Sequence, residues 1–240
     1  MRKLFVLFSI LGAQLLVNPT VYGQETGLTV TFGGGTFRMD DMKYLQDYIL
    51  SSYPVEGKVT SSFPPYFTAS AGVVRKLYYH VRMGGLYSYS TTGGRSNYTD
   101  YSGKISTDMI AVSHRFGAFV NYTILENDRL DLSLFGRLDV NLTDMSISSS
   151  VNILTLSSGI TNNYRSIGPA GSVGLELLYK FKEAAIGIEG GYMVDMPGKM
   201  TEKDTGEELL DPDDRQRELT MDWTGWRLGI KGIVWLNSTR

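Results

Sequence analysis

The residue types that catalyse reactions or hold metals are sparse in this sequence. The 240-residue chain has no cysteine and two histidines, His80 and His114, so disulfides, thiolate chemistry and cysteine-based metal sites are excluded. A catalytic nucleophile needs a base within hydrogen-bond reach. Ser113 precedes His114, but adjacent side chains of an extended segment point to opposite faces. We therefore predict no catalytic residue, no metal site and no cofactor.

Acidic side chains concentrate in a segment near the C-terminus. They are Glu202, Asp204, Glu207, Glu208, Asp211, Asp213 and Asp214. Carboxylates suit calcium, but this spacing does not match an EF-hand loop, and we favour a solvated acidic surface over a calcium site. Over the whole chain the formal net charge is only −2, which gives no electrostatic reason to expect nucleic acid as a partner.

Most other charged residues alternate with apolar ones, which is the period of a β-strand. Between Leu130 and Thr143 the even positions are aliphatic apart from one glycine, and the odd positions include Asp131, Arg137 and Asp139. The two faces of such a strand contact different solvents. We predict eight strands, at residues 27–37, 66–74, 79–90, 109–125, 130–143, 167–181, 184–195 and 226–236.

The connections between these strands alternate in length. Short ones lie at 75–78, 126–129 and 182–183, and long polar ones at 38–65, 91–107, 144–166 and 196–223. Short periplasmic turns and long outer loops are typical of outer-membrane barrels, whose strands need roughly 9–11 residues to span the bilayer. The predicted fold class is all-β: an eight-stranded antiparallel up-and-down transmembrane β-barrel with short periplasmic turns and long extracellular loops.

Aromatic residues on the apolar face form two predicted girdles, where amphipathic rings favour the headgroup level. Those at the periplasmic ends are Tyr79, Tyr122, Tyr179 and Phe181, and those at the outer ends are Phe67, Tyr87, Tyr89, Tyr192 and Trp226. By the same alternation His114 faces lipid, unless a local bulge turns it inward.

Charged residues remain on the face that an apolar exterior assigns to the barrel interior. They are Arg82, Arg115, Asp131, Arg137, Asp139, Glu176, Lys180, Glu189, Arg227 and Lys231, with His80 on the same face. The interior of an eight-stranded barrel is just wide enough for side chains to fill it, and buried charges must pair. We predict a structural ion-pair network; a narrow polar pore is the first alternative and a buried catalytic constellation the second.

Two segments flank or interrupt this pattern. Residues 1–23 read as a signal peptide, with Arg2 and Lys3 before an apolar stretch too short to span a bilayer as a helix, and residues 24–240 as the barrel domain. An N-terminal membrane anchor is the alternative.

Residues 40–50 have helical spacing with Asp40 as the N-cap, which predicts an amphipathic helix on the barrel rim or outer headgroups, or a binding element.

Several short strings resemble the outer-membrane β-barrel proteins of Bacteroidetes, within the wider OmpA/OmpX-like and porin-like small-barrel grouping. They are residues 63–67 (FPPYF), 93–103 (GGRSNYTDYSG), 168–176 (GPAGSVGLE) and 187–192 (GIEGGY). The resemblance covers the whole mature chain and implies a surface barrel, but no site residues carry over. Barrel proteins often end on an aromatic residue used in assembly, whereas here Trp235 is followed by five further residues.

We therefore expect an integral protein of the bacterial outer membrane that displays surface loops and has a structural or surface-interaction role. A narrow channel or small-solute transporter is the first alternative. A lipid-modifying enzyme is the second, disfavoured by the missing nucleophile–base pair. A soluble lipocalin-like barrel is the third. Expected partners are outer-membrane lipid and lipopolysaccharide, the outer-membrane assembly machinery, and an extracellular ligand bound by the loops.

Overall fold

The computed structural model describes residues 25–52, 58–78, 80–99, 101, 103–153 and 156–236. The predicted signal peptide, residues 1–23, lies outside these residues. Within them, no helix has the length and apolar character needed to cross a membrane.

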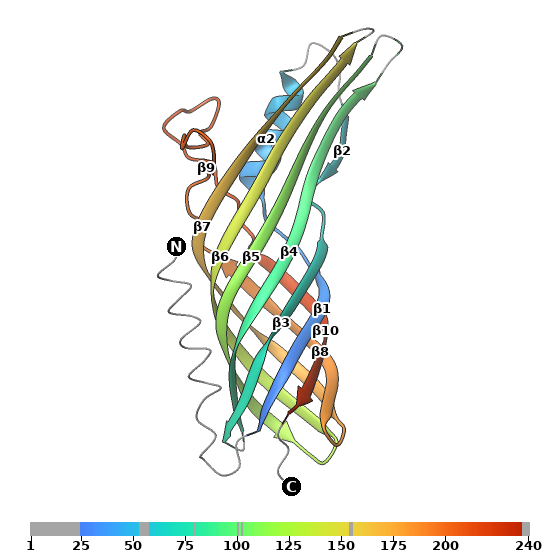
Figure 1. Ribbon diagram of the computed structural model, residues 1–240, viewed down its shortest axis with the longest axis vertical. Helices are drawn as coiled ribbons and strands as arrows, with labels where there is room; N and C mark the ends of the chain where they lie inside the picture. The colour runs from blue at the N-terminus through green and yellow to red at the C-terminus, as the bar shows by residue number, and fades with distance from the viewer. Residues whose placement is uncertain are drawn as a thin grey trace.

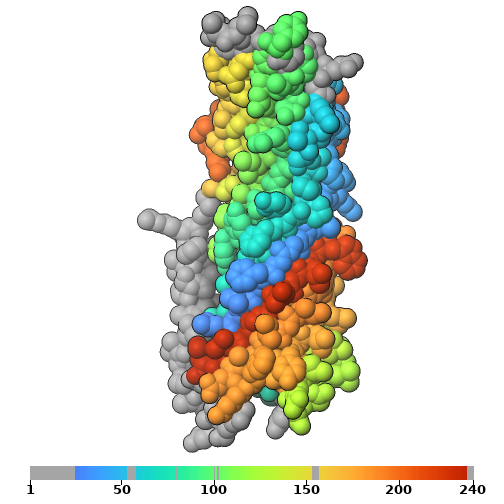
Figure 2. All heavy atoms as spheres, turned by 90° about the vertical axis from the view of Figure 1, so that its right-hand side faces the viewer, coloured from blue at the N-terminus to red at the C-terminus, as the bar shows by residue number. Residues whose placement is uncertain are grey.

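Eight antiparallel strands form a closed ring (Figure 1). They are β1 (Thr26–Gly35), β3 (Tyr66–Tyr78), β4 (Val81–Thr99), β5 (Gly103–Glu126), β6 (Leu130–Ile153), β7 (Leu156–Lys180), β8 (Ala184–Asp195) and β10 (Gly225–Trp235). The ring closes where β1 pairs with β10, from Gly27 opposite Trp235 to Gly35 opposite Arg227. This seam is visible in Figure 2 as the blue and red segments side by side. All eight predicted strands are present, so the predicted all-β fold, an eight-stranded antiparallel up-and-down barrel, is confirmed.

Four of the strands are much longer than the alternation predicts. Strands β4 to β7 have 19, 24, 24 and 25 residues, whereas β1, β8 and β10 have 10, 12 and 11. Their surplus length rises beyond the ring at the end opposite the short turns (Figure 1). We call this part the upper sheet, residues 91–99, 103–112, 144–153 and 156–169, and this end of the barrel the outer end. Residues 91–107 and 144–166, predicted as loops, are therefore mostly strand.

The polarity of the two strand faces exchanges where the upper sheet begins. On β6, exposed Leu138 faces outward and buried Asp139 faces the lumen. Higher on the same strand, Met145 lies on the luminal face and is buried, and Ser148, which faces outward, bonds to Thr161 of β7. The outward face of β6 is therefore apolar along the ring and polar above it, as expected where a strand leaves lipid and enters water.

The remaining elements are here called the cap: the helix packs on the luminal side of the upper sheet, and the two short strands pair with the strands at its edges. The cap consists of helix α2 (Asp40–Ser51), strand β2 (Lys58–Ser62), which pairs with β4, and residues 196–224, which include β9 (Thr201–Glu202). The predicted helix is present. Its N-cap is Met39 rather than Asp40, which occupies the first turn. Met42 and Leu45 are buried under the upper sheet, so the helix does not lie on headgroups.

The exterior of the ring is apolar between two aromatic zones. Its exposed aliphatic side chains include Leu28, Val30, Leu134, Leu138, Val173, Leu175, Ile186, Ile188, Leu228 and Ile230. At the outer end the rings of Tyr192 and Trp226 meet edge to face at 5.2 Å, and at the short-turn end Tyr179 and Phe181 do so at 5.1 Å. The predicted girdle residue Tyr79 lies outside the described residues.

Candidate functional site

The barrel lumen holds an ion-pair cluster centred on Glu176 of β7, whose side chain is completely buried. Arg82 of β4 donates to Glu176 Oε1 at 2.8 Å and to the Ser133 hydroxyl at 2.7 Å. Asn121 of β5 donates to Glu176 Oε2 at 3.0 Å, and Lys231 of β10 forms an ion pair with the same oxygen. One carboxylate thus joins strands from opposite sides of the ring, and both of its oxygens are satisfied.

A second carboxylate extends this cluster toward the outer end. Glu189 of β8 lies 3.1 Å from Lys231 Nζ through Oε2 and 3.7 Å from Arg137 Nη2 through Oε1. Lys231 therefore bridges Glu189 and Glu176. These contacts bring together five of the ten predicted interior charges, and the cations outnumber the carboxylates by one.

A separate cluster lies at the short-turn end. Lys180 Nζ forms ion pairs with Asp131 at 2.9 Å and with Glu126 at 3.1 Å. Lys180 and Asp131 belong to the predicted network but Glu126 does not, because the strand containing it was predicted to end one residue earlier. His80, predicted to face the lumen, is an exposed turn residue whose ring is 6.3 Å from that of Tyr122.

A hydrogen-bonded layer crosses the lumen at the outer end of the ring. Ser113 donates to Asn141 at 2.6 Å, and Asn141 donates to both carboxylate oxygens of Asp195 at 3.1 and 3.2 Å. Asp195 also accepts the backbone N–H of Trp223 at 3.1 Å, and the Trp223 indole N–H donates to Thr143 at 2.9 Å. Asp195 lies on the face that the alternation assigns to the lumen, which is the signal that could have added it to the predicted network.

Three predicted network residues are not brought into an ion pair within 4.0 Å among the described residues. Arg115 and Asp139 are buried, and one oxygen of Asp139 lacks a hydrogen-bond partner. Arg227 donates to the backbone carbonyls of Trp223 at 2.6 Å and Thr36 at 2.5 Å. Gly117 leaves the space that the Asp139 carboxylate occupies, since a Cβ there would lie 2.0 Å from its oxygen.

Two apolar clusters accompany these polar layers in the lumen. The upper cluster, which we call the plug, is rich in methionine and belongs largely to the cap and upper sheet: Phe37, Met39, Met42, Leu45, Phe63, Met109, Ala111, Met145, Ala170, Met193, Met200, Leu219, Met221 and Trp223. The lower cluster, which we call the floor, lies at the level of the Glu176 cluster and contains Val74, Leu86, Phe119, Leu178, Ala185 and Ile233. The sequence analysis predicted the polar interior but neither cluster.

Polar contacts tie the cap together outside the ring. The Tyr44 hydroxyl of α2 donates to Asp213 at 2.7 Å and Asp211 at 3.0 Å, and these hydrogen bonds, that to Asp213 above all, raise the pKa of Tyr44 above its ordinary value. The backbone N–H of Asp213 donates to Asp211 at 2.9 Å and lowers the pKa of that carboxyl. Arg217 forms ion pairs with Asp211 and with Asp41 of α2. Part of the acidic segment thus binds the helix.

His114 remains on the outward face, and no bulge turns it inward. Its Nδ1 and the Tyr87 hydroxyl are hydrogen-bonded at 2.7 Å, and the Tyr89 ring meets it edge-on at 5.6 Å. Tyr87 also packs against Phe116 at 5.1 Å. The polar atoms of His114 are thus sheltered within the outer aromatic zone, and Ser113 points into the lumen, where it bonds to Asn141.

Several solved structures resemble this chain in fold, at low sequence identity. No family model matches the chain, and no curated protein matches it. Among solved structures, the attachment invasion locus protein Ail of Yersinia pestis is 13% identical with a TM-score of 0.38, over 88% of this chain and 97% of that one. Neisserial surface protein A is 11% identical with a TM-score of 0.39, over 88% and 98%. The Escherichia coli outer membrane protease OmpT is 9% identical with a TM-score of 0.31, over 88% and 94%. The Bacteroidetes grouping suggested by the sequence stays a prediction.

Proposed function

We propose that this chain is an integral outer-membrane β-barrel protein whose role is to hold a rigid platform outside the cell for contact with other macromolecules. The observation that carries the proposal is the continuity of β4 to β7 from the ring into the upper sheet. Because β5 and β6 pair from Glu126 opposite Asp131 to Gly103 opposite Ile153, the platform and the barrel wall are the same strands. Such a platform is held by ladder hydrogen bonds rather than by flexible loops.

The two faces of the ring strands contact different solvents, and this difference supports the membrane part of the proposal. The shortest strands of the ring match the roughly 9–11 residues that a membrane strand needs, and the exposed aliphatic band is flanked by aromatic zones. Lipid and lipopolysaccharide would surround this band, and the outer-membrane assembly machinery would insert it. A soluble barrel would instead expose the same band to water at high cost.

The free edge of the upper sheet supports a surface-interaction role. Strand β8 pairs with β7 only from Ala170, and β9 pairs only with Tyr164 and Arg165. The Asn163 carbonyl accepts a hydrogen bond from the cap at 2.8 Å, so by alternation the backbone groups of Ser157, Gly159 and Thr161 also point away from β6. No described strand pairs with these three residues. An extended polypeptide segment of a partner could add there as a further strand.

The filled lumen favours this role over the channel alternative. The plug fills the lumen at the outer end, and the floor and the Glu176 cluster fill it together nearer the short-turn end. The surroundings of His114 likewise favour it over the lipid-modifying enzyme, since tyrosines rather than a nucleophile or a carboxylate contact the imidazole.

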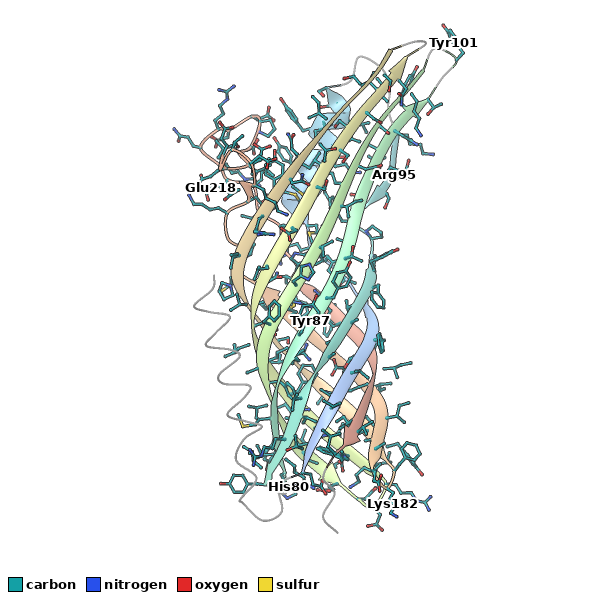
Figure 3. The ribbon with its side chains drawn as sticks, viewed as in Figure 1. His80, Tyr87, Arg95, Tyr101, Lys182 and Glu218 are labelled. Carbon is teal, nitrogen blue, oxygen red and sulfur yellow. The ribbon has the colours of Figure 1, made fainter. Side chains whose placement is uncertain are left out.

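The orientation in the membrane is testable because the chain has no cysteine. Tyr101, which is fully exposed, and Lys182, in a short turn, lie at opposite ends of the molecule (Figure 3). We expect a membrane-impermeant maleimide to label Tyr101→Cys but not Lys182→Cys in intact cells. After lysis both variants should be labelled, which is the control for thiol reactivity.

The same variants separate the proposal from its alternatives. Labelling of Lys182→Cys alone would show that the platform faces the periplasm. Recovery of the protein in the soluble periplasmic fraction, without a shift in gel mobility between boiled and unboiled samples, would replace the membrane barrel with a soluble one.

A further inference from the structure

A groove of about 690 Å³ crosses the outward wall of the ring, over strands β4 to β8. Its lining includes Ala118 of β5, Gly136 of β6 and Gly171 of β7. Two bulkier residues, Val120 and Val173, lie on either side of Gly136 in the strand register. A Cβ at Gly136 would meet no atom within 4 Å, and one at Gly171 would meet its nearest atoms at 3.7 Å. Open space therefore lies above both glycines.

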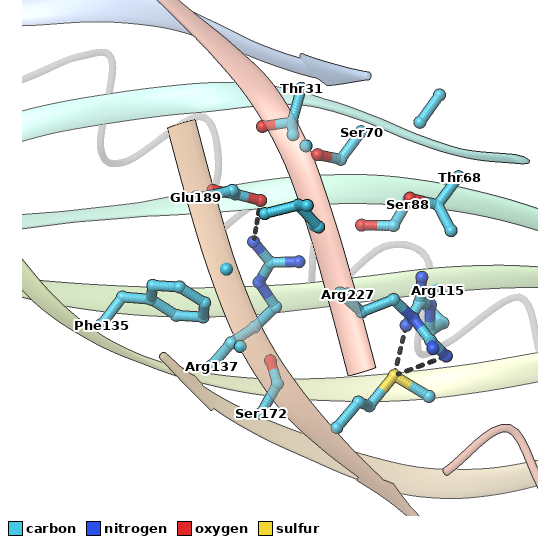
Figure 4. Close-up of a pocket in the computed structure, with 16 residues that line it drawn as sticks. Thr31, Thr68, Ser70, Ser88, Arg115, Phe135, Arg137, Ser172, Glu189 and Arg227 are labelled. Carbon is cyan, nitrogen blue, oxygen red and sulfur yellow. Dashed lines mark hydrogen bonds and ion pairs between the residues drawn. The ribbon is translucent and has the colours of Figure 1, made fainter. Parts of the chain in front are cut away.

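The groove belongs to the exposed aliphatic band of the ring. Leu138 and Val194 of that band line it, together with Tyr192 of the outer aromatic zone. Its volume is in the range of roughly 300–1,000 Å³ that is usual for small-molecule sites. The lumen has far less room, since the cavity lined by Arg115 and Arg227 measures about 40 Å³ (Figure 4). An apolar groove that faces lipid matches a hydrocarbon chain.

Two cations share one carboxylate directly above this band. On the outward face, the last apolar pair of β6 and β7 is Leu142 opposite Ile167, and the next pair toward the outer end is charged. In that pair, Arg165 donates to both oxygens of Asp144, at 2.8 and 3.2 Å. Lys203 Nζ lies 2.8 Å from the same carboxylate. The cluster therefore has one net positive charge at the level where lipid headgroups begin, and its side chains are 27 to 39% exposed.

The acidic residue next to this cluster in sequence faces the other way. Glu202 lies opposite Tyr164, which packs against the plug on the luminal side. Successive residues of an extended segment point to opposite faces, so Glu202 lies on the luminal side and Lys203 on the outward side. Among the described residues, Asp144 has the only carboxylate within 4.0 Å of Arg165 or Lys203. The positive charge is therefore not cancelled locally.

The groove and the cation cluster are joined along β7. Arg165 lies four residues beyond Pro169, which lines the groove. Four strand residues span roughly 13 Å, which is roughly 9 Å of depth at a strand tilt of about 45°. One leaflet contributes about half of the roughly 30 Å hydrocarbon core. An acyl chain whose headgroup contacts Arg165 therefore reaches the groove within its own leaflet.

We propose that this surface binds one phosphate-bearing lipid of the outer leaflet, with its phosphate on Arg165 and Lys203 and an acyl chain in the groove. Arginine and lysine both bind phosphate by charge-assisted hydrogen bonds, and Asp144 holds the two cations side by side. The inference rests on the proposed location in the outer membrane and adds a specific site for one of the expected partners.

The test measures lipid binding to the purified protein in a nonionic detergent, by native mass spectrometry. The probes are phosphatidic acid, diacylglycerol with the same acyl chains, and inorganic phosphate. We expect one phosphatidic acid per chain, with diacylglycerol and inorganic phosphate each binding about tenfold more weakly or less, the loss expected for one charge-assisted contact. Equal binding of phosphatidic acid and diacylglycerol would overturn the phosphate site, and binding of inorganic phosphate as tight as that of the lipid would overturn the acyl site.

Charge variants test the headgroup end. Lys203→Gln and Arg165→Gln should each weaken phosphatidic acid toward the affinity of diacylglycerol. Arg95→Gln is the matched control, because it removes an exposed arginine that pairs with Asp108 away from this cluster. If Arg165→Gln does not fold, as judged by heat-modifiable mobility on a gel, Lys203→Gln still decides. A loss of affinity that is the same for the control would show that the overall charge, and not this cluster, attracts the lipid.

A groove variant tests the acyl end. Gly136→Leu fills the open space and should weaken both phosphatidic acid and diacylglycerol. Gly232→Leu is the control, since this glycine of β10 also has room for a Cβ, with its nearest atom at 3.6 Å, outside the groove. A dimer that Gly136→Leu dissociates would overturn the proposal, because a second copy would then occupy the groove. Labelling of Tyr101→Cys in intact cells decides the membrane location separately, since binding in detergent does not depend on orientation.

Discussion

Among single residues, Glu176 is the one on which the central ion-pair cluster depends. Its two oxygens contact Arg82, Lys231 and Asn121, from strands β4, β10 and β5. Because the surrounding lumen excludes bulk water, each of these partners depends on the negative charge. Losing the carboxylate leaves two buried cations with one fewer counter-ion, and that residual charge is the main cost.

We therefore expect Glu176→Gln to be strongly destabilising although glutamine has the same shape. Breaking a buried pair by removing one partner costs about 3–5 kcal/mol, and urea unfolding in lipid vesicles measures it. Glu183→Gln, in an exposed turn, is the control and should change stability by less than about 0.5 kcal/mol. Equal effects of the two substitutions would mean that water or a neighbouring group replaces the Glu176 charge.

Asp211 gives the cap a pH dependence with a defined sign. The hydrogen bond from the Asp213 backbone N–H lowers its pKa below the ordinary 3.8. A lowered folded-state pKa contributes stability above the unfolded value, and this contribution is lost as the pH falls through the folded value. We expect the cap to loosen below about pH 3.8, seen as a red shift in the emission of Trp223 when it is the sole tryptophan. Asp211→Asn should shift less with acid, and an identical acid transition would exclude this carboxyl as the cause.

At the scale of elements, the sequence predicts the ring well and the upper sheet poorly, for one physical reason. Period-two alternation predicts a strand whichever of its two faces is apolar. The strands of the ring, however, were predicted from segments whose outward face is apolar. On β6 the apolar positions change from even to odd numbers between Leu142 and Met145, because the outside becomes water and the inside becomes the plug. Strand β6 itself continues without a bulge toward either neighbour at this point.

The cap shows a second limit of prediction from the sequence. The 3.6-residue spacing of α2 is local and predicts the helix, but its docking depends on contacts far away in sequence, such as Asp41 with Thr220 and Gln46 with Ser96. A Cβ at Gly94 would lie about 3.0 Å from the Gln46 amide, so a larger residue there would shift that amide. The interior charges followed from alternation, but which of them pair depends on the register around the ring.

Packing of α2 on the upper sheet is testable by truncating its buried face. Met42 is fully buried in the plug, so Met42→Ala should destabilise the docked helix by about 2–5 kcal/mol and speed proteolytic cleavage of α2. Lys43→Ala removes a partly exposed neighbour and is the matched control. No difference in cleavage rate between the two variants would indicate that the helix is not held by this cluster.

The edge of β7 should be visible in amide hydrogen exchange. Backbone groups of Thr161 point away from β6, whereas those of Ile160 pair with β6 near Ser149. We expect the Thr161 amide to exchange rapidly and the Ile160 amide to be protected, in spectra of the protein in detergent. Equal protection of both amides would show that another strand already covers this edge.

The whole molecule is a closed column whose interior is filled at successive levels. From the outer end these are the plug, the Asp195 layer, the cavity lined by Arg115 and Arg227, the level that the Glu176 cluster shares with the floor, and the Lys180 cluster. Each charged layer is thereby shielded from bulk water, which strengthens its pairs. A rigid, filled barrel is suited to supporting a platform, because movement of the platform would require sliding whole strand ladders.

This layering predicts that two barriers in series oppose ion flow. The wild-type protein should show no steady conductance in planar bilayers, and neither Trp223→Gly in the plug nor Phe119→Gly in the floor should open it, because the other apolar cluster remains intact. The double variant should conduct if both clusters act as barriers, and silence there would assign the block to the Glu176 cluster, which lies at the level of the floor. Open, reproducible steps from wild-type protein would instead favour the narrow channel, because they require a continuous water path past both clusters.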